Sequence, residues 1–258
     1  MLLCIDIGNT NTVLATFDRD KLVHNWRVKT DARNTADELG LMFRGLLAGD
    51  AVEITGVAAC STVPAALRSV RTMLARYYGD LPNVIVEPGV KTGVQLAIDN
   101  PKEVGADRVV NTLAAASVYG GPCIVVDFGT ATIFDAVSER GEYLGGAIAP
   151  GIEVSLEALR ARGAQLQPVE LARPRSVIGK STVEALRSGV VFGFAGLVDG
   201  VVTAMSAAIG SDPDRVRVIA TGPQAQLVVE ESDTIDDYDP WLTLTGLRLV
   251  YERNTAAR

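Results

Sequence analysis

The segment LLCIDIGNTNTVLATF, residues 2–17, opens the chain with a pattern that governs the expected fold. An apolar run leads into Asp6, and a glycine, an asparagine and threonines follow before β-forming residues resume. This pattern predicts two strands joined by a turn. Gly and Asn tolerate positive φ and are ordinary hairpin residues, so the segment alone is equally typical of a purely structural turn.

The pattern returns in the second half of the chain as CIVVDFGTATIFDAV, residues 123–137. Asp127 stands where Asp6 stood, and Gly129 and hydroxyl residues again follow before a second apolar run. A repeat at the scale of half the chain indicates a duplicated α/β unit. We therefore predict two halves, residues 1–119 and 120–258.

The intervening segments alternate between strand and helix patterns. Thr35 and Glu38 have the spacing of a capping box at a helix start, and Pro64 suits the first turn of the next helix. Strands are predicted over 22–28, 54–61, 83–89 and 216–222. Helices are predicted over 35–49, 63–79, 103–121, 154–164, 181–210 and 241–254, and a turn segment over 141–151.

Composition excludes several classes of function. The 258 residues carry a formal net charge of −7, which argues against a nucleic-acid partner because such proteins need a basic face. The start of the chain lacks a signal-peptide pattern, and no uninterrupted apolar run approaches the roughly 20 residues of a membrane helix. The three cysteines are far apart and odd in number, which is typical of reduced thiols in a cytoplasmic protein.

Two turns of this kind could hold the phosphates of a nucleotide between them. Gly8 allows close approach to the backbone, and exposed amides with hydroxyl side chains can donate to phosphate oxygens. Asp6 could hold Mg²⁺ directly or through water. Gly129 and Thr130 offer a second cradle. Positioning and charge neutralisation of this kind are what phosphoryl transfer requires.

A phosphotransferase also needs a base for the acceptor hydroxyl, and NPKEVGADRVVN, residues 100–111, offers one. Asp107 follows Gly105 at a predicted helix start, beside Arg108. A first-turn aspartate is also a common structural cap, favoured by the helix dipole. The adjacent arginine favours the functional interpretation, because it can bind a carboxylate in bidentate fashion.

The chain resembles the type III pantothenate kinases of the acetate and sugar kinase/Hsp70/actin superfamily over nearly its whole length. The resemblance rests on six ordered motifs: DIGNTNT at 6–12, NPKEVGADR at 100–108, DFGTAT at 127–132, GGAIAPG at 145–151, RPRSVIGKSTVEALRSG at 173–189 and ATG at 220–222. It implies an α/β fold of duplicated actin-like (ribonuclease H-like) domains, with mixed sheets flanked by helices. It also implies an enzyme that phosphorylates pantothenate to 4'-phosphopantothenate with ATP, the first step of coenzyme A biosynthesis.

The resemblance assigns roles to matching positions. Asp107 would be the catalytic base, and Asp127 would hold a monovalent cation (K⁺ or NH₄⁺). The implied ATP-binding residues are Asp6, Ile7, Gly8, Asn9, Thr10, Asn11, Thr12, Val13 and Thr130. The implied pantothenate-binding residues are Gly105, Ala106, Asp107, Arg108 and Thr182. A cytoplasmic homodimer is implied as well.

Two positions depart from the pattern of many relatives. Ile98 stands where a tyrosine commonly lines the pantothenate pocket, and Pro223 follows Thr221 and Gly222 where a second glycine is common. Proline removes one amide donor from a loop near the adenosine. These departures keep open an alternative, a catalytically weak or inactive homologue that acts as a binding or regulatory protein. A different phosphotransferase or a phosphatase of the superfamily is a third interpretation.

Overall fold

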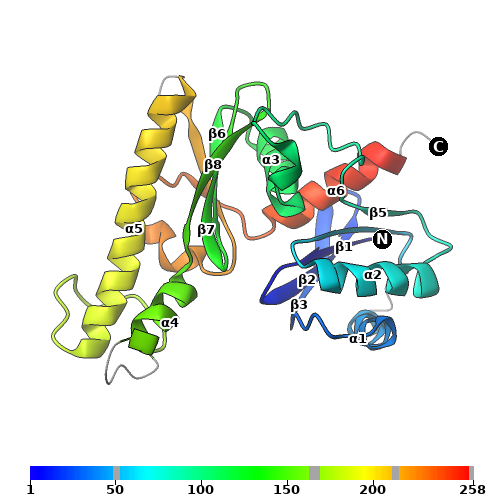
Figure 1. Ribbon diagram of the computed structural model, residues 1–258, viewed down its shortest axis with the longest axis horizontal. Helices are drawn as coiled ribbons and strands as arrows, with labels where there is room; N and C mark the ends of the chain where they lie inside the picture. The colour runs from blue at the N-terminus through cyan, green and yellow to red at the C-terminus, as the bar shows by residue number, and fades with distance from the viewer. Residues whose placement is uncertain (49–52, 163–168, 211–214, 256–258) are drawn as a thin grey trace. The chain divides into compact units, whose positions relative to one another are not determined.

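The computed structural model describes residues 1–48, 53–162, 169–210 and 215–255. The chain forms two compact units (Figure 1). Unit 1 consists of Met1–Val94, Asn100–Ala114 and Leu242–Arg258, and unit 2 of Gln95–Asp99 and Ala115–Trp241. The C-terminal segment therefore returns to the first unit. The predicted functional halves, residues 1–119 and 120–258, stay a prediction.

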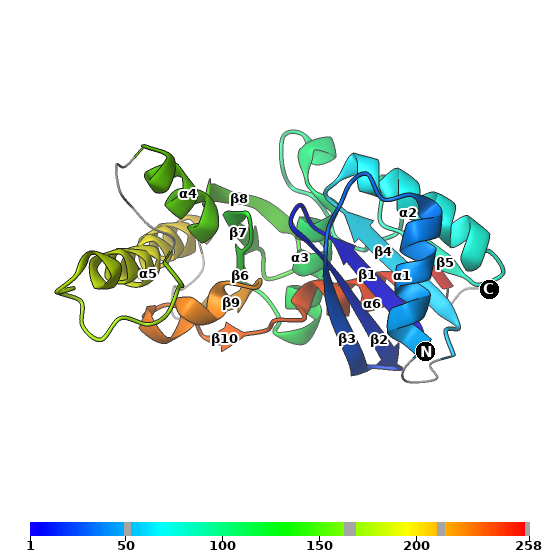
Figure 2. The ribbon, with the colours of Figure 1, turned by 90° about the horizontal axis from the view of Figure 1, so that it is seen from below.

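Unit 1 is built on a five-stranded sheet of order β3-β2-β1-β4-β5. β1 is antiparallel to β2 and parallel to β4, and β4 is parallel to β5. Helices α1 and α2 cover one face, and α6 lies on the other (Figure 2). The elements are β1 (Leu2–Ile7), β2 (Asn11–Asp18), β3 (Lys21–Lys29), α1 (Ala36–Ala48), β4 (Gly56–Ser61), α2 (Pro64–Tyr77), β5 (Asn83–Ile85), the 3₁₀ turn η1 (Pro101–Glu103), the first part of α3 (Ala106–Val118), which continues into unit 2, and α6 (Leu242–Thr255).

The period of two along β1 sends alternate side chains to the two faces of the sheet. Leu3, Ile5 and Ile7 are buried in one cluster with residues of α1 and α2. Cys4 and Asp6 alternate with them and so point to the opposite face. The strand that packs the core therefore also presents Asp6 away from it.

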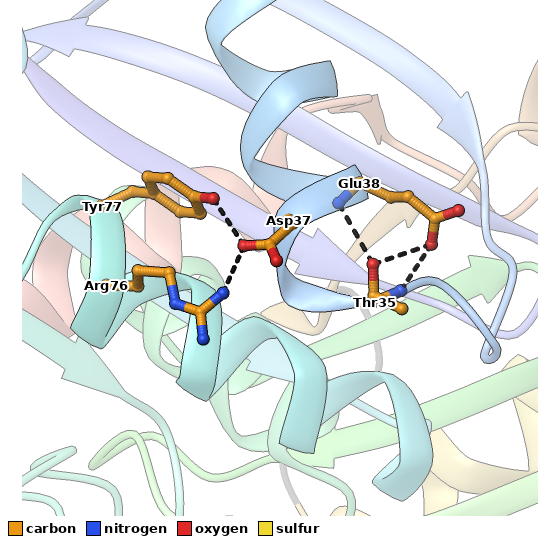
Figure 3. Close-up of polar contacts among 5 residues, drawn as sticks. All are labelled: Thr35, Asp37, Glu38, Arg76 and Tyr77. Atoms are coloured by element: carbon orange, nitrogen blue, oxygen red, sulfur yellow. Dashed lines mark hydrogen bonds and ion pairs between the residues drawn. The ribbon is translucent and has the colours of Figure 1, made fainter.

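The predicted capping box at the start of α1 is confirmed (Figure 3). The Thr35 hydroxyl accepts from the Glu38 backbone N–H at 3.3 Å, and the Glu38 carboxylate accepts from the Thr35 backbone N–H at 2.8 Å. The carboxylate of Asp37 binds Arg76 and Tyr77 of α2. The two helices are thus tied together at this end by polar contacts as well as by the shared core.

Unit 2 repeats the strand connections of unit 1. Its sheet has the order β10-β9-β6-β7-β8, with β6 antiparallel to β7 and parallel to β9. β6 and β7 correspond to the second copy of the opening motif, so the predicted duplication agrees with the observed topology. The elements are β6 (Cys123–Phe128), β7 (Ala131–Val137), β8 (Tyr143–Pro150), α4 (Ile152–Arg162), α5 (Thr182–Ile209), β9 (Arg217–Thr221), the 3₁₀ turns η3 (Ala225–Leu227) and η4 (Val229–Glu231), and β10 (Asp237–Tyr238).

The prediction of a turn segment over 141–151 was wrong, because most of it forms β8 along β7. Glycines at 145 and 146 suggested a turn, but Gly145 is accommodated in the strand with φ of 116°. The register shifts between Ala136 and Val137 nearby. Strand irregularities of this kind are places where glycines occur.

Helix α5 is long and apolar enough to cross a membrane by length and composition alone. Asp199 interrupts its apolar sequence, which is why no uninterrupted run stood out in the sequence. One side, including Val191, Ala195 and Val198, is buried, the last two in the core of unit 2. The exposed side carries Gly189, Gly193, Gly196 and Gly200, and a Cβ added at any of them would meet no atom within 4 Å.

Candidate active site

Asp6 lies at the carboxyl end of β1, between residues of two neighbouring strands. Its register partners are Val13 on β2 and Cys60 on β4. Neighbours across a sheet share a face, so Asp6 and Cys60 point to the same side. The Cys60 thiol donates to Asp6 Oδ1 at 3.3 Å. The strand pairing therefore places the neutral Cys60 thiol as a hydrogen-bond donor beside the carboxylate of Asp6, which the sequence predicts to bind the nucleotide.

The turn after Asp6 is closed by its own backbone and by β3. The Gly8 N–H donates to the Asn11 carbonyl at 3.0 Å, and the Thr30 N–H donates to the Thr10 carbonyl at 2.9 Å. A Cβ on Gly8 would lie 3.2 Å from the Asn11 carbonyl oxygen, closer than most real Cβ contacts. Asn9 and Thr10 are exposed at the tip. The turn is thus a fixed loop with polar groups at its surface.

Thr12, one of the predicted ATP-binding residues, points the other way. It is buried, and its hydroxyl lies 2.9 Å from that of Thr30. Thr12 pairs with Ile7, whose side chain is in the α1–α2 core, so both face away from Asp6. A ligand at the turn could therefore contact only the backbone of Thr12, because its hydroxyl is hydrogen-bonded to Thr30.

Asp107 occupies the first turn of α3, as the sequence predicted. Its Oδ1 is shielded from solvent and has no hydrogen-bond partner among the described residues. Burial raises the pKa of this carboxyl, although the backbone N–H groups of Arg108 and of Asp107 itself offset part of the effect. A Cβ on Gly105 would lie 2.4 Å from Oδ1, so glycine there allows this orientation.

Asp6 and Asp107 influence each other electrostatically within unit 1. Burial raises the pKa of Asp6 to about 6, the Asp107 carboxylate adds to the rise, and the Cys60 hydrogen bond opposes it. Burial also raises the pKa of Cys60 well above its usual range, with both carboxylates contributing, so the thiol is neutral. Unit 1 therefore brings Asp6 together with Asp107, while their segments are about 100 residues apart in sequence.

These groups fit a divalent cation that arrives with a nucleotide. The described residues hold no group of three or more His, Cys, Asp or Glu that could bind a metal by itself. Mg²⁺ is commonly held by one or two carboxylates together with substrate phosphates, so a full protein cage is not required. The unsatisfied Oδ1 of Asp107 and the raised pKa of Asp6 both indicate negative charge that a cation would stabilise.

The second predicted loop, in unit 2, is fixed by glycines from two later segments. Asp127 lies at the end of β6, and a Cβ on Gly222 would lie 2.5 Å from its Oδ1. The Thr130 carbonyl accepts from the Gly151 N–H at 3.1 Å, and a Cβ on Gly151 would meet that carbonyl oxygen at 2.4 Å. Both glycines permit close approach to the loop. Sequence reasoning noted their motifs but not this packing role.

The remaining predicted positions of unit 2 lie on separate elements. Thr182 is the first residue of α5 and is exposed, and its neighbour Ser181 caps the helix by accepting from the Glu184 N–H at 3.2 Å. Ile98 packs near Gly145 of β8, whose added Cβ would lie 3.7 Å from Ile98 Cγ2. Beyond Pro223, the Gln224 N–H donates to the Phe128 carbonyl at 3.4 Å.

Cys60 is the residue that sequence reasoning missed, because it was treated only as a buried thiol. Its register with Asp6 depends on a parallel pairing between β1 and β4. β1 ends at Ile7 and β4 ends at Ser61, and aligning those two ends in a parallel pair places position 60 beside position 6.

Comparisons with known proteins agree with this geometry. The family model for type III pantothenate kinase matches residues 2–204. A type III pantothenate kinase of Salinispora arenicola is 72% identical over 254 residues, covering 98% of this chain and 100% of the relative. The chain belongs to the type III pantothenate kinase family. The predicted family is therefore confirmed, and with it an enzyme of the kinase class.

Solved structures confirm the predicted fold class for this type III pantothenate kinase family member. A polyphosphate/ATP-glucomannokinase from an Arthrobacter species has a TM-score of 0.53 at 13% identity, covering 100% of this chain and 99% of that chain. A structure described as a Baf family transcriptional activator from Campylobacter jejuni has a TM-score of 0.61 at 19% identity, covering 98% and 99%. At these identities the likeness shows the actin-like, sugar-kinase fold alone, and it gives the regulatory alternative no support.

Proposed function

We propose that this chain transfers the γ-phosphoryl group of ATP to the primary hydroxyl of pantothenate, forming 4'-phosphopantothenate for coenzyme A biosynthesis. Membership of the type III pantothenate kinase family supports the reaction. The observation that carries the assignment of roles is Asp107. Its buried, unsatisfied Oδ1 stands in the first turn of α3, within electrostatic reach of Asp6. No observation favours a regulatory function over the enzyme.

Asp107 acts as the base. An aspartate with its ordinary pKa of about 4 is a weak base towards an alcohol. Burial raises the pKa of Asp107 and so improves the match between base and proton donor. The alcohol becomes acidic only as its oxygen bonds to phosphorus, so the proton moves to Asp107 as that bond forms. The carboxylate also orients the hydroxyl for in-line attack.

Two loops hold the nucleotide in this proposal. In unit 1 the turn over Ile7–Val13, with the exposed side chains of Asn9 and Thr10, contacts the phosphates, and Thr130 is the phosphate contact that unit 2 offers. Asp6 holds Mg²⁺, which neutralises phosphate charge when bound. Asn11 and Val13 lie on the same face as Asp6, which supports this loop assignment.

Pantothenate is bound by Gly105–Arg108 and by Thr182. The Arg108 guanidinium suits the pantothenate carboxylate, because planar paired donors match two carboxylate oxygens. Ile98 supplies an apolar surface for the gem-dimethyl group, although it lacks the hydroxyl of the tyrosine common at this position. Asp127 holds the monovalent cation, and the tight packing of Gly222 against its Oδ1 fixes that carboxylate.

A homodimer formed through α5 belongs to the same proposal. The glycine stripe on the exposed side of this helix would let a second helix approach closely. Val177, Ile178 and Val183, just before and within the first turn of α5, are also exposed. An apolar helix with one exposed side is explained by a partner subunit without a membrane. Free, buried cysteines agree with the cytoplasmic location we propose.

The first experiment is a coupled assay of ADP release. It compares reactions with and without pantothenate at millimolar ATP and Mg²⁺, with potassium or sodium in parallel. We expect pantothenate-dependent turnover that is higher in potassium and is lost in Asp107→Asn, whose Kd for ATP stays within about twofold. Full activity of Asp107→Asn would remove the proposed base. Absence of pantothenate-dependent turnover in the folded wild type would refute the function itself.

The oligomeric state is tested separately by light scattering after gel filtration. Gly196→Arg places a long charged side chain in the glycine stripe, and we expect it to give monomers. Leu41→Arg, at an exposed position of α1, is the matched control and should leave the dimer intact. A dimer that survives Gly196→Arg would exclude this face of α5 as the interface.

A further inference from the structure

Cys60 is buried at the end of β4, with no exposed surface. It is held there by the parallel register of β1 and β4, which sets it directly opposite Asp6. Its thiol donates to one oxygen of the Asp6 carboxylate, and Asp107 lies within electrostatic reach of both groups. None of the roles argued above uses this residue.

We propose that Cys60 is a positioning residue for nucleotide binding: its thiol holds Oδ1 of Asp6 and leaves the other carboxylate oxygen available to the divalent cation. This inference rests on the proposed function, because it assumes that Asp6 meets a nucleotide-bound cation. A carboxylate at a strand end can rotate about its terminal torsion, which has broad preferences. A donor on one oxygen limits that rotation, and the rigid pairing of β1 and β4 limits movement of the donor.

A thiol suits this task because it is weak and neutral. A lysine or arginine beside Asp6 would pair with the carboxylate and reduce its attraction for a cation. A thiol is a weak donor that carries no charge, so Asp6 keeps its negative charge. The thiol is also small and largely apolar, so it packs under the turn without needing further polar partners.

The effect of losing this contact should be modest and confined to one ligand. Net contributions of single hydrogen bonds correspond to roughly two- to tenfold changes in an equilibrium constant. In Cys60→Ala, Asp6 loses its donor while Asp107 still repels it. We therefore expect the Kd of the magnesium complex of a non-hydrolysable ATP analogue to rise about three- to tenfold. The KM for pantothenate should stay within twofold.

The experiment compares Cys60→Ala, Cys60→Ser and Cys123→Ala in the full-length protein. Serine keeps a hydroxyl donor, so it should restore the nucleotide Kd to within about twofold of wild type. Cys123 is buried in β6, and burial alone raises its pKa to about 12, so its variant controls for loss of a buried thiol. Calorimetry measures Kd with Mg²⁺ and with EDTA, and steady-state assays measure kcat and both KM values.

Three outcomes would overturn the proposal. The first is a Cys60→Ala protein that binds the magnesium complex as wild type does. The second is an equal loss in Cys60→Ser and Cys60→Ala. The third is the same fold-change in EDTA as in Mg²⁺, which would indicate altered packing of the turn. Should Cys60→Ala fail to fold, Cys60→Val removes the donor without a cavity and takes its place. Because calorimetry needs no turnover, a wild type inactive on pantothenate refutes the proposed function and still leaves this inference open to test.

Discussion

Replacing Gly105 by alanine should separate catalysis from stability at the proposed base. The new Cβ would stand 2.4 Å from Oδ1 of Asp107, where an ordinary carbon–oxygen contact needs roughly 3.2 Å or more. Gly105 is not among the glycines with positive φ, so alanine can adopt its backbone conformation. The cost therefore falls on the Asp107 carboxylate, which must move by about 1 Å.

That movement should change the free energy of unfolding little and lower kcat substantially. The displaced atom is the end of a rotatable side chain, so we expect the free energy of unfolding to change by less than about 1 kcal/mol. A displacement of about 1 Å at a reacting group can cost up to a hundredfold in rate. We expect kcat to fall about ten- to a hundredfold, with the KM for MgATP within threefold of wild type.

The assay is pantothenate-dependent ADP release, paired with urea unfolding of the same protein. Gly45→Ala is the matched control, because a Cβ at this exposed position of α1 meets nothing within 4 Å. Its kcat should be unchanged, and helix propensity should raise its stability by about 0.5–1 kcal/mol. A Gly105→Ala enzyme with kcat within twofold of wild type would refute the claim that this orientation of Asp107 is the catalytic one.

Four further substitutions, at three positions, test the charge and packing of unit 1. Asp6→Asn should stabilise the ligand-free protein by at most about 3 kcal/mol at pH 7.5, because the pKa of about 6 means that the ionised carboxyl costs stability above that pH. This destabilisation by the ionised carboxyl falls as the pH drops from 6 towards the unfolded-state pKa near 4. In urea unfolding, the stability gained by Asp6→Asn should therefore be smaller at pH 4.5 than at pH 7.5, and an equal gain at both would contradict the argument. Gly246→Ala should lower the free energy of unfolding by about 1–3 kcal/mol in the same measurement, because its Cβ would lie 2.2 Å from the Val110 carbonyl oxygen of α3. An unchanged free energy of unfolding would show that α3 and α6 can move apart to make room for the Cβ without loss of stability. Thr35→Ala should lose about 1 kcal/mol while Thr35→Ser loses only a few tenths, and an equal loss in both would exclude the cap as the cause.

The fold could be predicted where local patterns and the overall architecture agree. The repeated run of apolar residues, aspartate, glycine and hydroxyls indicated two equivalent strand pairs, and β1–β2 and β6–β7 are those pairs. The Thr35–Glu38 capping box marked a helix start correctly because its hydrogen bonds are local. β8 was missed because its pairing with β7 is a tertiary contact that outweighs the turn preference of its glycines.

The sequence singles out the carboxylates of the candidate site but not the residues that pack against them. Asp6 and Asp107 stood out because acidic residues beside glycines carry recognisable chemistry. Cys60 and Gly246 act through pairings of segments that are distant in the chain, with β1 and with α3 respectively. Those pairings follow from strand order and helix crossing, which a period of two or 3.6 along one segment does not specify. Thr12 shows the converse, since its motif indicated a phosphate contact while strand alternation sends its hydroxyl into the unit 1 core.

The carboxylates of Asp6 and Asp107 lower the stability of the ligand-free fold. Burial and mutual repulsion raise the pKa of Asp6 and burial raises that of Asp107, so both are held at a free-energy cost in the ligand-free protein. An apolar or amide replacement would remove that cost, and such departures from consistency tend to mark functional sites. In the proposed function, a cation that binds with the nucleotide would offset this repulsion, and the protein would therefore favour the metal-bound nucleotide. The neutral thiol of Cys60 fits the same logic, because it orients Asp6 without cancelling the charge that a cation requires.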